Sequence, residues 1–205
     1  MKKVLYLFIF CIIFFITKSF ANNEIKDFVV RLGSEFDTIN KVVDKKEKLN
    51  SSYEITKKYV DINWMGNFIL GRHRKELNKE QIATFVDLFS QFLLKNYIDI
   101  FSSLSNDNFT FKDTKLIKEN NYLCNIELYL DQKLVKVDLR IVKTKNNTYI
   151  IRDILPEGLS FINTQRNEID SIINTKGFDF LINDIKNKIN WFFKIKCYNQ
   201  FYIIT

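Results

Sequence analysis

Histidine, cysteine, glycine and proline are all scarce in this sequence of 205 residues, and each shortage excludes a class of protein. One histidine cannot supply a two- or three-histidine metal centre, and three cysteines are too few for a zinc ribbon. The five scattered glycines form no phosphate-binding loop. A single proline, together with 27% charged residues, argues against a disordered chain.

Apolar side chains are abundant by contrast. Hydrophobic residues make up 46% of the chain and aromatic residues 15%, including 20 Phe. A chain of this length forms one domain or at most two small ones. Its composition therefore provides for a large apolar core or for an apolar cavity.

The first 21 residues have the pattern of a secretory signal peptide. Met1–Lys3 is basic, Val4–Thr17 is an almost unbroken apolar run, and Ser19 and Ala21 are the small residues expected before a cleavage site. The run is short for a membrane-spanning helix, although an uncleaved anchor is the alternative. The sequence predicts export, with residues 22–190 as the functional domain.

Much of the positive charge belongs to this leader. Removing residues 1–21 takes away three lysines and no acidic residue, so the formal charge falls from +7 to +4. The remaining cations form no block of five or six like charges. We therefore expect no nucleic-acid partner.

Two cysteines, Cys124 and Cys197, remain beyond the leader. An oxidising compartment would permit a disulfide between them. Cys124 falls on the apolar side of a predicted strand, which favours a buried thiol. The pairing is left open.

Helical periodicity marks the first half of the domain. An apolar stripe with helical spacing runs through residues 24–44. Residues 45–48 are interpreted as a solvated turn or helix end, and Ser52 as the cap of a second helix. Gly71 is a plausible C-terminal cap. Asn78 and Gln81 form a capping box that begins a long helix reaching about Leu104.

The apolar period then changes from that of a helix to that of a strand. Residues 121–131 and 133–143 alternate as half-buried antiparallel strands joined at Asp131-Gln132. Residues 149–155 form a further strand, and a weaker one lies near 109–117. Two helices follow, capped at Ser160 and divided at Gly177. This order predicts an α+β fold.

The last residues, 191–205, are apolar without a clear period. They are compatible with an extra strand, a contact with a partner or an unstructured end. Their role is unknown from the sequence.

Candidate catalytic groups are few. His73 is surrounded by cations and is interpreted as an exposed surface residue. Asp138 and Asp153 each fall within a predicted strand, where we expect the solvent side of the sheet or a salt bridge to Arg140 or Arg152. Neither pattern indicates a catalytic site, and no metal site is expected.

Several ordered segments resemble the MlaC family of periplasmic phospholipid-binding proteins, also called the toluene-tolerance auxiliary component. The resemblance covers roughly residues 25–189. Its segments are Asp61–Met65, Leu70–Arg72, Asn78–Gln81 with Phe85, Phe89, Leu93 and Tyr97, then Tyr149–Ile154, Glu157–Phe161, Gln165–Ile169 and Gly177–Ile182.

The resemblance implies a curved antiparallel sheet of about four to five strands, wrapped by N- and C-terminal helices around an apolar cavity. It also implies a periplasmic carrier, without cofactor, that shuttles phospholipid. The implied partners are an inner-membrane ABC transporter with an MCE-domain subunit and an outer-membrane lipoprotein–porin complex. We expect a monomer.

A set of apolar residues is predicted to line the lipid cavity, although ordinary core packing is an equally good reading of each one singly. The sheet would contribute Val137, Leu139, Tyr149 and Ile151. The facing wall would contribute Trp64, Met65, Phe68, Phe89, Leu93, Tyr97 and Phe161.

Two other functions remain open at this stage. A small α+β enzyme of the isomerase or dehydratase kind would need Asp138 or Asp153 buried beside a tyrosine. A lipoprotein chaperone or interaction module would need no ligand at all. Phospholipid in the purified protein would separate the carrier from both.

Overall fold

The computed structural model describes residues 23–102, 109–130 and 133–201. The expected leader and the expected hairpin residues Asp131 and Gln132 lie outside this part of the chain. The first described element is a helix over residues 23–40. The remaining elements are α2 (Lys45–Tyr59), α3 (Ile62–Leu70), the 3-10 helix η1 (Gly71–Lys75), α4 (Lys79–Ser102), β1 (Phe109–Lys118), β2 (Asn121–Leu130), β3 (Lys133–Lys143), β4 (Tyr149–Pro156), α5 (Phe161–Lys176) and α6 (Phe178–Phe201).

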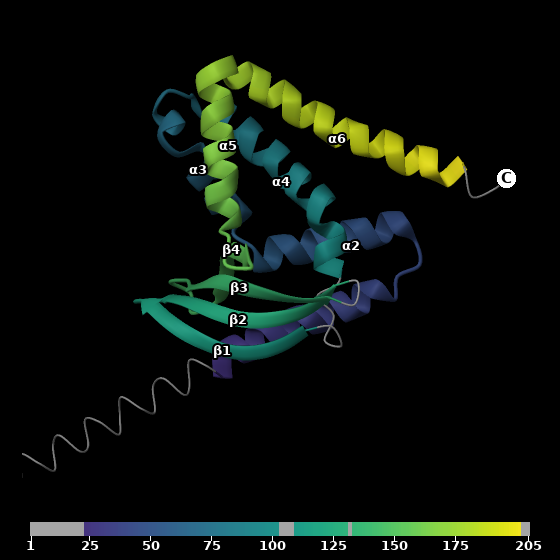
Figure 1. The fold of residues 1–205 in the computed structure, drawn as a ribbon, viewed down its shortest axis with the longest axis vertical. Coiled ribbons are helices and arrows are strands. Elements are labelled where there is room, and N and C mark those ends of the chain that lie inside the picture. The colour runs from purple at the N-terminus through teal and green to yellow at the C-terminus, as the bar shows by residue number, and fades with distance from the viewer. Residues whose placement is uncertain (1–22, 103–108, 131–132, 202–205) are drawn as a thin grey trace, which may run out of the picture.

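The four described strands form one antiparallel sheet in the order β1-β2-β3-β4. Figure 1 shows that this sheet is curved. The β1–β2 and β3–β4 pairings contain register shifts, one of them beside Arg140, and such irregularities bend a strand. The predicted α+β class and curved antiparallel sheet are confirmed.

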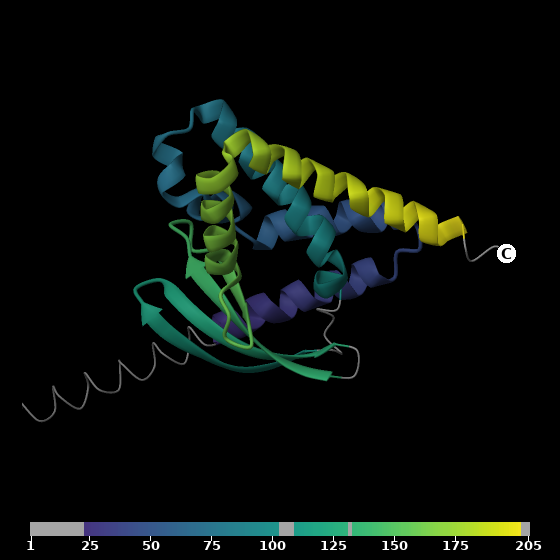
Figure 2. The same ribbon diagram turned by 45° about the horizontal axis from the view of Figure 1, so that its top comes forward.

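The helices gather on one side of the sheet. Figures 1 and 2 show the helix 23–40, in purple, lying along the sheet, with α2, α4 and α6 stacked beyond it. Buried residues of this helix, of α3 to α6 and of the strands belong to one apolar cluster. The helical layer and the sheet therefore share a single core.

Side-chain caps set the starts of several helices. Asn78 and Gln81 exchange hydrogen bonds from their backbone N–H groups to each other's side chains, at 3.0 and 2.9 Å, which confirms the capping box of α4. The hydroxyl of Ser160 accepts from Asn163 N at 3.2 Å and caps α5. Gly71, with φ of 55°, ends α3 as expected.

The start of α2 differs from the expectation. Asp44 is the cap, because its carboxylate accepts a hydrogen bond from Glu47 N at 2.7 Å, so residues 45–48 form the first helical turn rather than a solvated turn. Ser52 lies inside the helix, where its hydroxyl donates to the carbonyl of Lys48 at 2.8 Å. A carboxylate is the stronger cap here, since it also complements the positive end of the helix dipole.

The backbone of residues 191–201 continues α6. This excludes an extra strand over that part of the chain. The expected end of the domain at residue 190 therefore falls within a helix.

Candidate functional site

The sheet presents a continuous apolar face to the helices. Ile126 of β2 pairs with Val137 of β3, and Cys124 pairs with Leu139; each of these four side chains is at most 5% exposed. Polar residues of the same strands alternate with them and point to the opposite face. The sequence pattern thus gave the inner face of β2 and β3 correctly.

The helix 23–40 covers part of this apolar face. Its buried side chains recur every three or four residues, as expected for a helix with one apolar face. They are Ile25, Phe28, Val29, Leu32, Phe36 and Ile39. The same core cluster includes the buried side chains of the strands. This helix therefore packs on the apolar face of the sheet and shares its core.

Aromatic side chains of α4 and α5 pack together in the helical layer. Phe85 and Phe89 are fully buried on α4 and stack with ring centroids 5.9 Å apart. Phe161, at the start of α5, lies 6.5 Å from Phe89. These rings join the helical layer to the segment that follows β4.

The predicted lining residues fall into three groups. Met65, Phe89, Leu93, Val137, Leu139 and Ile151 are buried members of the common core. Trp64, Phe68, Tyr149 and Phe161 are half-buried and pack against it. Tyr97 lies on α4, and its side chain is outside the described part of the molecule. Contact of any of them with lipid remains a prediction.

Trp64 and Phe68 make a stack that the sequence did not predict. Their rings lie 5.1 Å apart on α3. The guanidinium of Arg152 lies over Trp64 at 4.8 Å, and that of Arg166 lies over Phe68 at 4.9 Å. Cation–π contacts on both sides join α3 to β4 and α5. Arg152 also donates to Asp61 at 2.9 Å, so that its charge is balanced.

Two Glu–Tyr–Lys clusters fasten the helix 23–40 to the rest of the fold. Glu24 accepts hydrogen bonds from the Tyr149 hydroxyl at 2.6 Å and from Lys143 Nζ at 3.1 Å. These bonds, and the charge of Lys143, lower the pKa of Glu24. Burial, followed by the bond to Glu24, raises the pKa of Tyr149.

The second cluster has the same chemistry at the other end of the helix. Glu35 accepts from the Tyr59 hydroxyl at 2.7 Å and from Lys58 Nζ. Burial opposes ionisation of Glu35, but the bonds from Lys58 and Tyr59 outweigh it and lower the pKa of this carboxyl. Sequence reasoning missed both clusters, although Glu24 and Glu35 are three helical turns apart on one side of the helix.

Asp153 is fully buried, so the expectation of a solvent-facing carboxylate was wrong. Its oxygens accept hydrogen bonds from Ile154 N, Ile162 N and the Ser160 hydroxyl, at 3.0, 3.2 and 2.7 Å. The expected salt bridge to Arg140 is present at 3.7 Å. The strand position was right, but the chain after β4 folds over this carboxylate and uses it to start α5.

His73 is also buried, at 4% exposure, where a surface position was expected. Its Nε2 lies 2.8 Å from Asp170 Oδ1, and Arg72 Nε lies 3.1 Å from the same oxygen. Asp170 comes from α5, far along the sequence, so the local run of cations gave no sign of it. The bond from His73, with the charge of Arg72, lowers the pKa of Asp170.

Cys124 is a free, buried thiol in the middle of the apolar face. Burial raises its pKa to about 12. This agrees with the reading of Cys124 as a buried thiol. The side chain of Cys197 lies outside the described part.

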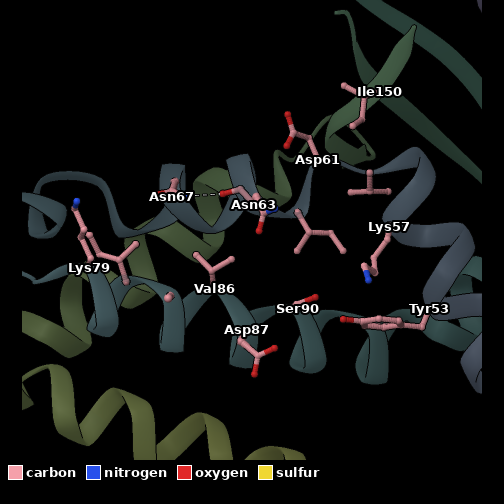
Figure 3. A pocket seen from close by; sticks show the side chains of 14 residues that line it. Tyr53, Lys57, Asp61, Asn63, Asn67, Lys79, Val86, Asp87, Ser90 and Ile150 are labelled. Atoms are coloured by element: carbon pink, nitrogen blue, oxygen red, sulfur yellow. Dashed lines mark hydrogen bonds between the residues drawn. The ribbon is translucent and has the colours of Figure 1, made fainter.

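A groove of about 570 Å³ lies between α2, α3 and α4 (Figure 3). Val86, Asp87 and Ser90 of α4 line one side of it, and Asn63 and Asn67 of α3 line the other. A second groove, of about 700 Å³, follows the helix 23–40 and contains the Glu24–Tyr149–Lys143 cluster.

The residues that the structure describes lack both a metal-binding cluster and a membrane-spanning helix. They contain no group of three or more His, Cys, Asp or Glu side chains that could hold a metal ion. None of their helices combines the length and the apolar character that crossing a bilayer requires.

Comparison with known proteins identifies the family. The family model of the MlaC protein matches residues 33–187, which is most of the chain. This chain belongs to the MlaC family. The predicted family resemblance is therefore confirmed.

Two individual proteins show how far the likeness to MlaC proteins extends. The intermembrane phospholipid transport system binding protein MlaC of Haemophilus influenzae is 22% identical over 129 residues, or 60% of each chain. The present chain thus spans about 60% of the length of that curated relative. The phospholipid-binding protein of Ralstonia solanacearum, solved in complex with a phospholipid, superposes with a TM-score of 0.67 at 17% identity, covering 78% of this chain and 92% of its own. This second likeness establishes the fold.

Proposed function

We propose that this protein is a periplasmic carrier that holds phospholipid by its acyl chains, between the apolar face of the sheet and the helices. Membership of the MlaC family is the observation that carries the proposal. The fold it shares with a protein solved in complex with a phospholipid supports it. So does the apolar face centred on Ile126, Val137 and Leu139.

The physical need for such a carrier follows from the hydrophobic effect. Each CH₂ group moved out of water is worth about 0.8 kcal/mol, so the roughly 28 such groups of two acyl chains would cost about 20 kcal/mol to expose between membranes. A protein that encloses the chains removes most of this barrier. It needs apolar walls, and it needs no acid, base, metal or other cofactor.

The carrier would act between two membrane complexes. One is an inner-membrane ABC transporter with an MCE-domain subunit, and the other is an outer-membrane lipoprotein–porin complex. A leader over residues 1–21 would direct the chain to the periplasm, where it would act as a monomer. Asp153, one of the two carboxylates that the enzyme alternative named, is buried as that alternative requires, but two backbone N–H groups and a hydroxyl already donate to it.

Lipid extracted from the native protein tests the proposal directly. Mass spectrometry of the extract should find diacyl phospholipid at about one to two molecules per chain, the load expected of a small apolar pocket. Protein purified without lipid, and unable to take up labelled phospholipid after delipidation, would contradict it.

Variants on β3 locate the pocket. Leu139→Asp places a charge on the apolar face and should abolish lipid uptake, whereas Leu134→Asp alters an exposed side chain, 46% accessible, on the same strand and should not. Val137→Phe fills space without adding charge and should reduce uptake while the circular dichroism spectrum is retained. Normal uptake by folded Leu139→Asp and Val137→Phe proteins would place the lipid elsewhere.

A further inference from the structure

The groove of about 700 Å³ along the helix 23–40 has a composition that points to a ligand of mixed charge. One side of the helix supplies Glu24, Asp27 and Arg31 to its lining. Lys58 lines it from the end of α2, and Lys143 lines it from β3. The lining thus holds three cationic and two anionic side chains, and Glu35, which lies outside the lining, accepts a hydrogen bond from Lys58.

Four of these charges are already balanced in two pairs. Glu24 is bonded to Lys143, and Glu35 is bonded to Lys58, with a tyrosine hydroxyl completing each cluster. A simple anion would therefore meet no excess of positive charge here. The two remaining charges decide what the groove can bind.

Asp27 and Arg31 are those remaining charges. They lie one helical turn apart, are exposed, and both line the groove. Neither makes an ion pair or hydrogen bond with another of the described residues, although side chains at this spacing are close enough to pair. A carboxylate and a guanidinium, side by side and each available, complement a ligand that carries an ammonium and an anionic oxygen.

The floor of the groove leads toward the apolar interior. Phe28 and Tyr59 are buried, with ring centroids 5.3 Å apart, and Tyr149 lies 6.0 Å from Phe28 on the other side. Tyr122 adjoins Tyr149 at 6.0 Å and pairs across the sheet with Ile141, which is on the apolar face. The groove is therefore separated from the apolar face by this layer of aromatic rings, which places its charged rim next to the apolar interior.

We propose that this groove binds the zwitterionic head group of a phospholipid, with the phosphodiester at Arg31 and the ammonium at Asp27. The assignment rests on the proposed carrier function. It adds a preference among head groups. A guanidinium is suited to phosphate oxygens, and a carboxylate accepts hydrogen bonds from a primary ammonium.

A competition experiment on the delipidated full-length protein tests this assignment. The protein is offered an equimolar mixture of phosphatidylethanolamine and phosphatidylglycerol with identical acyl chains, and the bound lipids are counted by mass spectrometry. The native protein should bind the ethanolamine lipid preferentially, by about two- to fivefold, the range that exposed charge pairs provide. Asp27→Asn should remove the preference by lowering the share of the ethanolamine lipid that is bound, because the ammonium loses its carboxylate partner.

Arg31→Gln should lower uptake of both lipids, because both carry a phosphodiester. Lys26→Gln removes a positive charge from an exposed position of the same helix that does not line the groove, so it should alter neither quantity and serves as the matched control. A further arm adds inorganic phosphate at millimolar concentration, which should not displace lipid. Displacement by phosphate would identify a free-anion site and overturn the head-group assignment.

The remaining outcomes separate the two proposals. Unbiased uptake of both lipids by the native protein would overturn the head-group site and leave the carrier function intact. No uptake of either lipid would overturn both. A circular dichroism spectrum of each variant is recorded with the binding measurement, so that a variant that has lost its fold is recognised.

Discussion

His73 Nε2 lies 2.8 Å from Asp170 Oδ1, which joins η1 to α5 across 97 residues of sequence. The histidine is buried, so removal of Asp170 would leave its ring nitrogen without a partner. We expect Asp170→Ala to lower the free energy of unfolding, because a buried ring nitrogen loses its hydrogen bond. Urea denaturation followed by circular dichroism measures this change.

The neighbouring residue Arg74 provides the control for that experiment. It is exposed and belongs to the same 3-10 helix, so Arg74→Gln should change stability by less than about 0.5 kcal/mol. Equal stability of the Asp170→Ala and native proteins would show that the His73 contact does not contribute to the fold.

Asp153 gives a second prediction about stability. The carboxylate of Asp153 accepts hydrogen bonds from two backbone N–H groups and from the Ser160 hydroxyl. In Asp153→Asn the side-chain NH₂ group, which can only donate, would face one or more of these donors. We expect a loss of about 2–4 kcal/mol, from one misplaced buried polar group and a weakened start of α5. Asp113→Asn on β1, an exposed carboxylate, is the control in thermal and urea unfolding.

The same substitution bears on the enzyme alternative. If Asp153 serves only to hold α5, then Asp153→Asn protein that remains folded should still take up phospholipid. Suppose that folded Asp153→Asn protein takes up no phospholipid, while the Asp113→Asn control binds lipid as the native protein does. The carboxylate of Asp153 would then have a role beyond the start of α5.

Cys124 should be chemically inert in the folded protein. Burial raises its pKa to about 12, so only about one thiol in ten thousand is ionised at pH 8. In the Cys11→Ser, Cys197→Ser variant, a thiol-specific reagent such as DTNB should react fully in guanidinium chloride and very slowly without it. Rapid reaction of the folded variant would mean that the apolar face around Cys124 is open to water.

Glu24 predicts a dependence of stability on pH. Its pKa is lowered in the folded protein by the bonds from Tyr149 and Lys143, so its stabilising contribution is present above the unfolded-state value of 4.5. That contribution is lost as the pH falls through the lower folded-state pKa. The difference in unfolding free energy between native and Glu24→Gln proteins should therefore be present at pH 7 and disappear well below pH 4.5.

Denaturant titrations at several pH values measure this difference. Glu119→Gln, at an exposed position in the turn between β1 and β2, should show no such loss toward acid pH. A difference for Glu24→Gln that persists unchanged into strong acid would indicate that the ionised carboxylate is not what holds the helix 23–40 to the sheet.

Local chemistry in the sequence was sufficient for much of the fold. The alternation along β2 and β3 placed Val137 and Leu139 on the inner face, because successive side chains of a strand point to opposite sides. Asn78, Ser160 and Gly71 marked helix ends, since their caps are made with residues only a few positions away. The resemblance to the family could be recognised because it rests on short local segments that follow one another in the expected order along the chain.

Contacts between distant segments could not be predicted in this way. The sequence by itself determined the α+β class, the apolar side of β2 and β3, several helix ends and the family. Only the tertiary structure decided that His73 is buried against Asp170, that Asp153 is covered by the start of α5, and that Glu24 meets Tyr149 and Lys143. Periodicity reports which side of its own element a residue occupies, whereas burial and pairing depend on which other element the folded chain brings to that side.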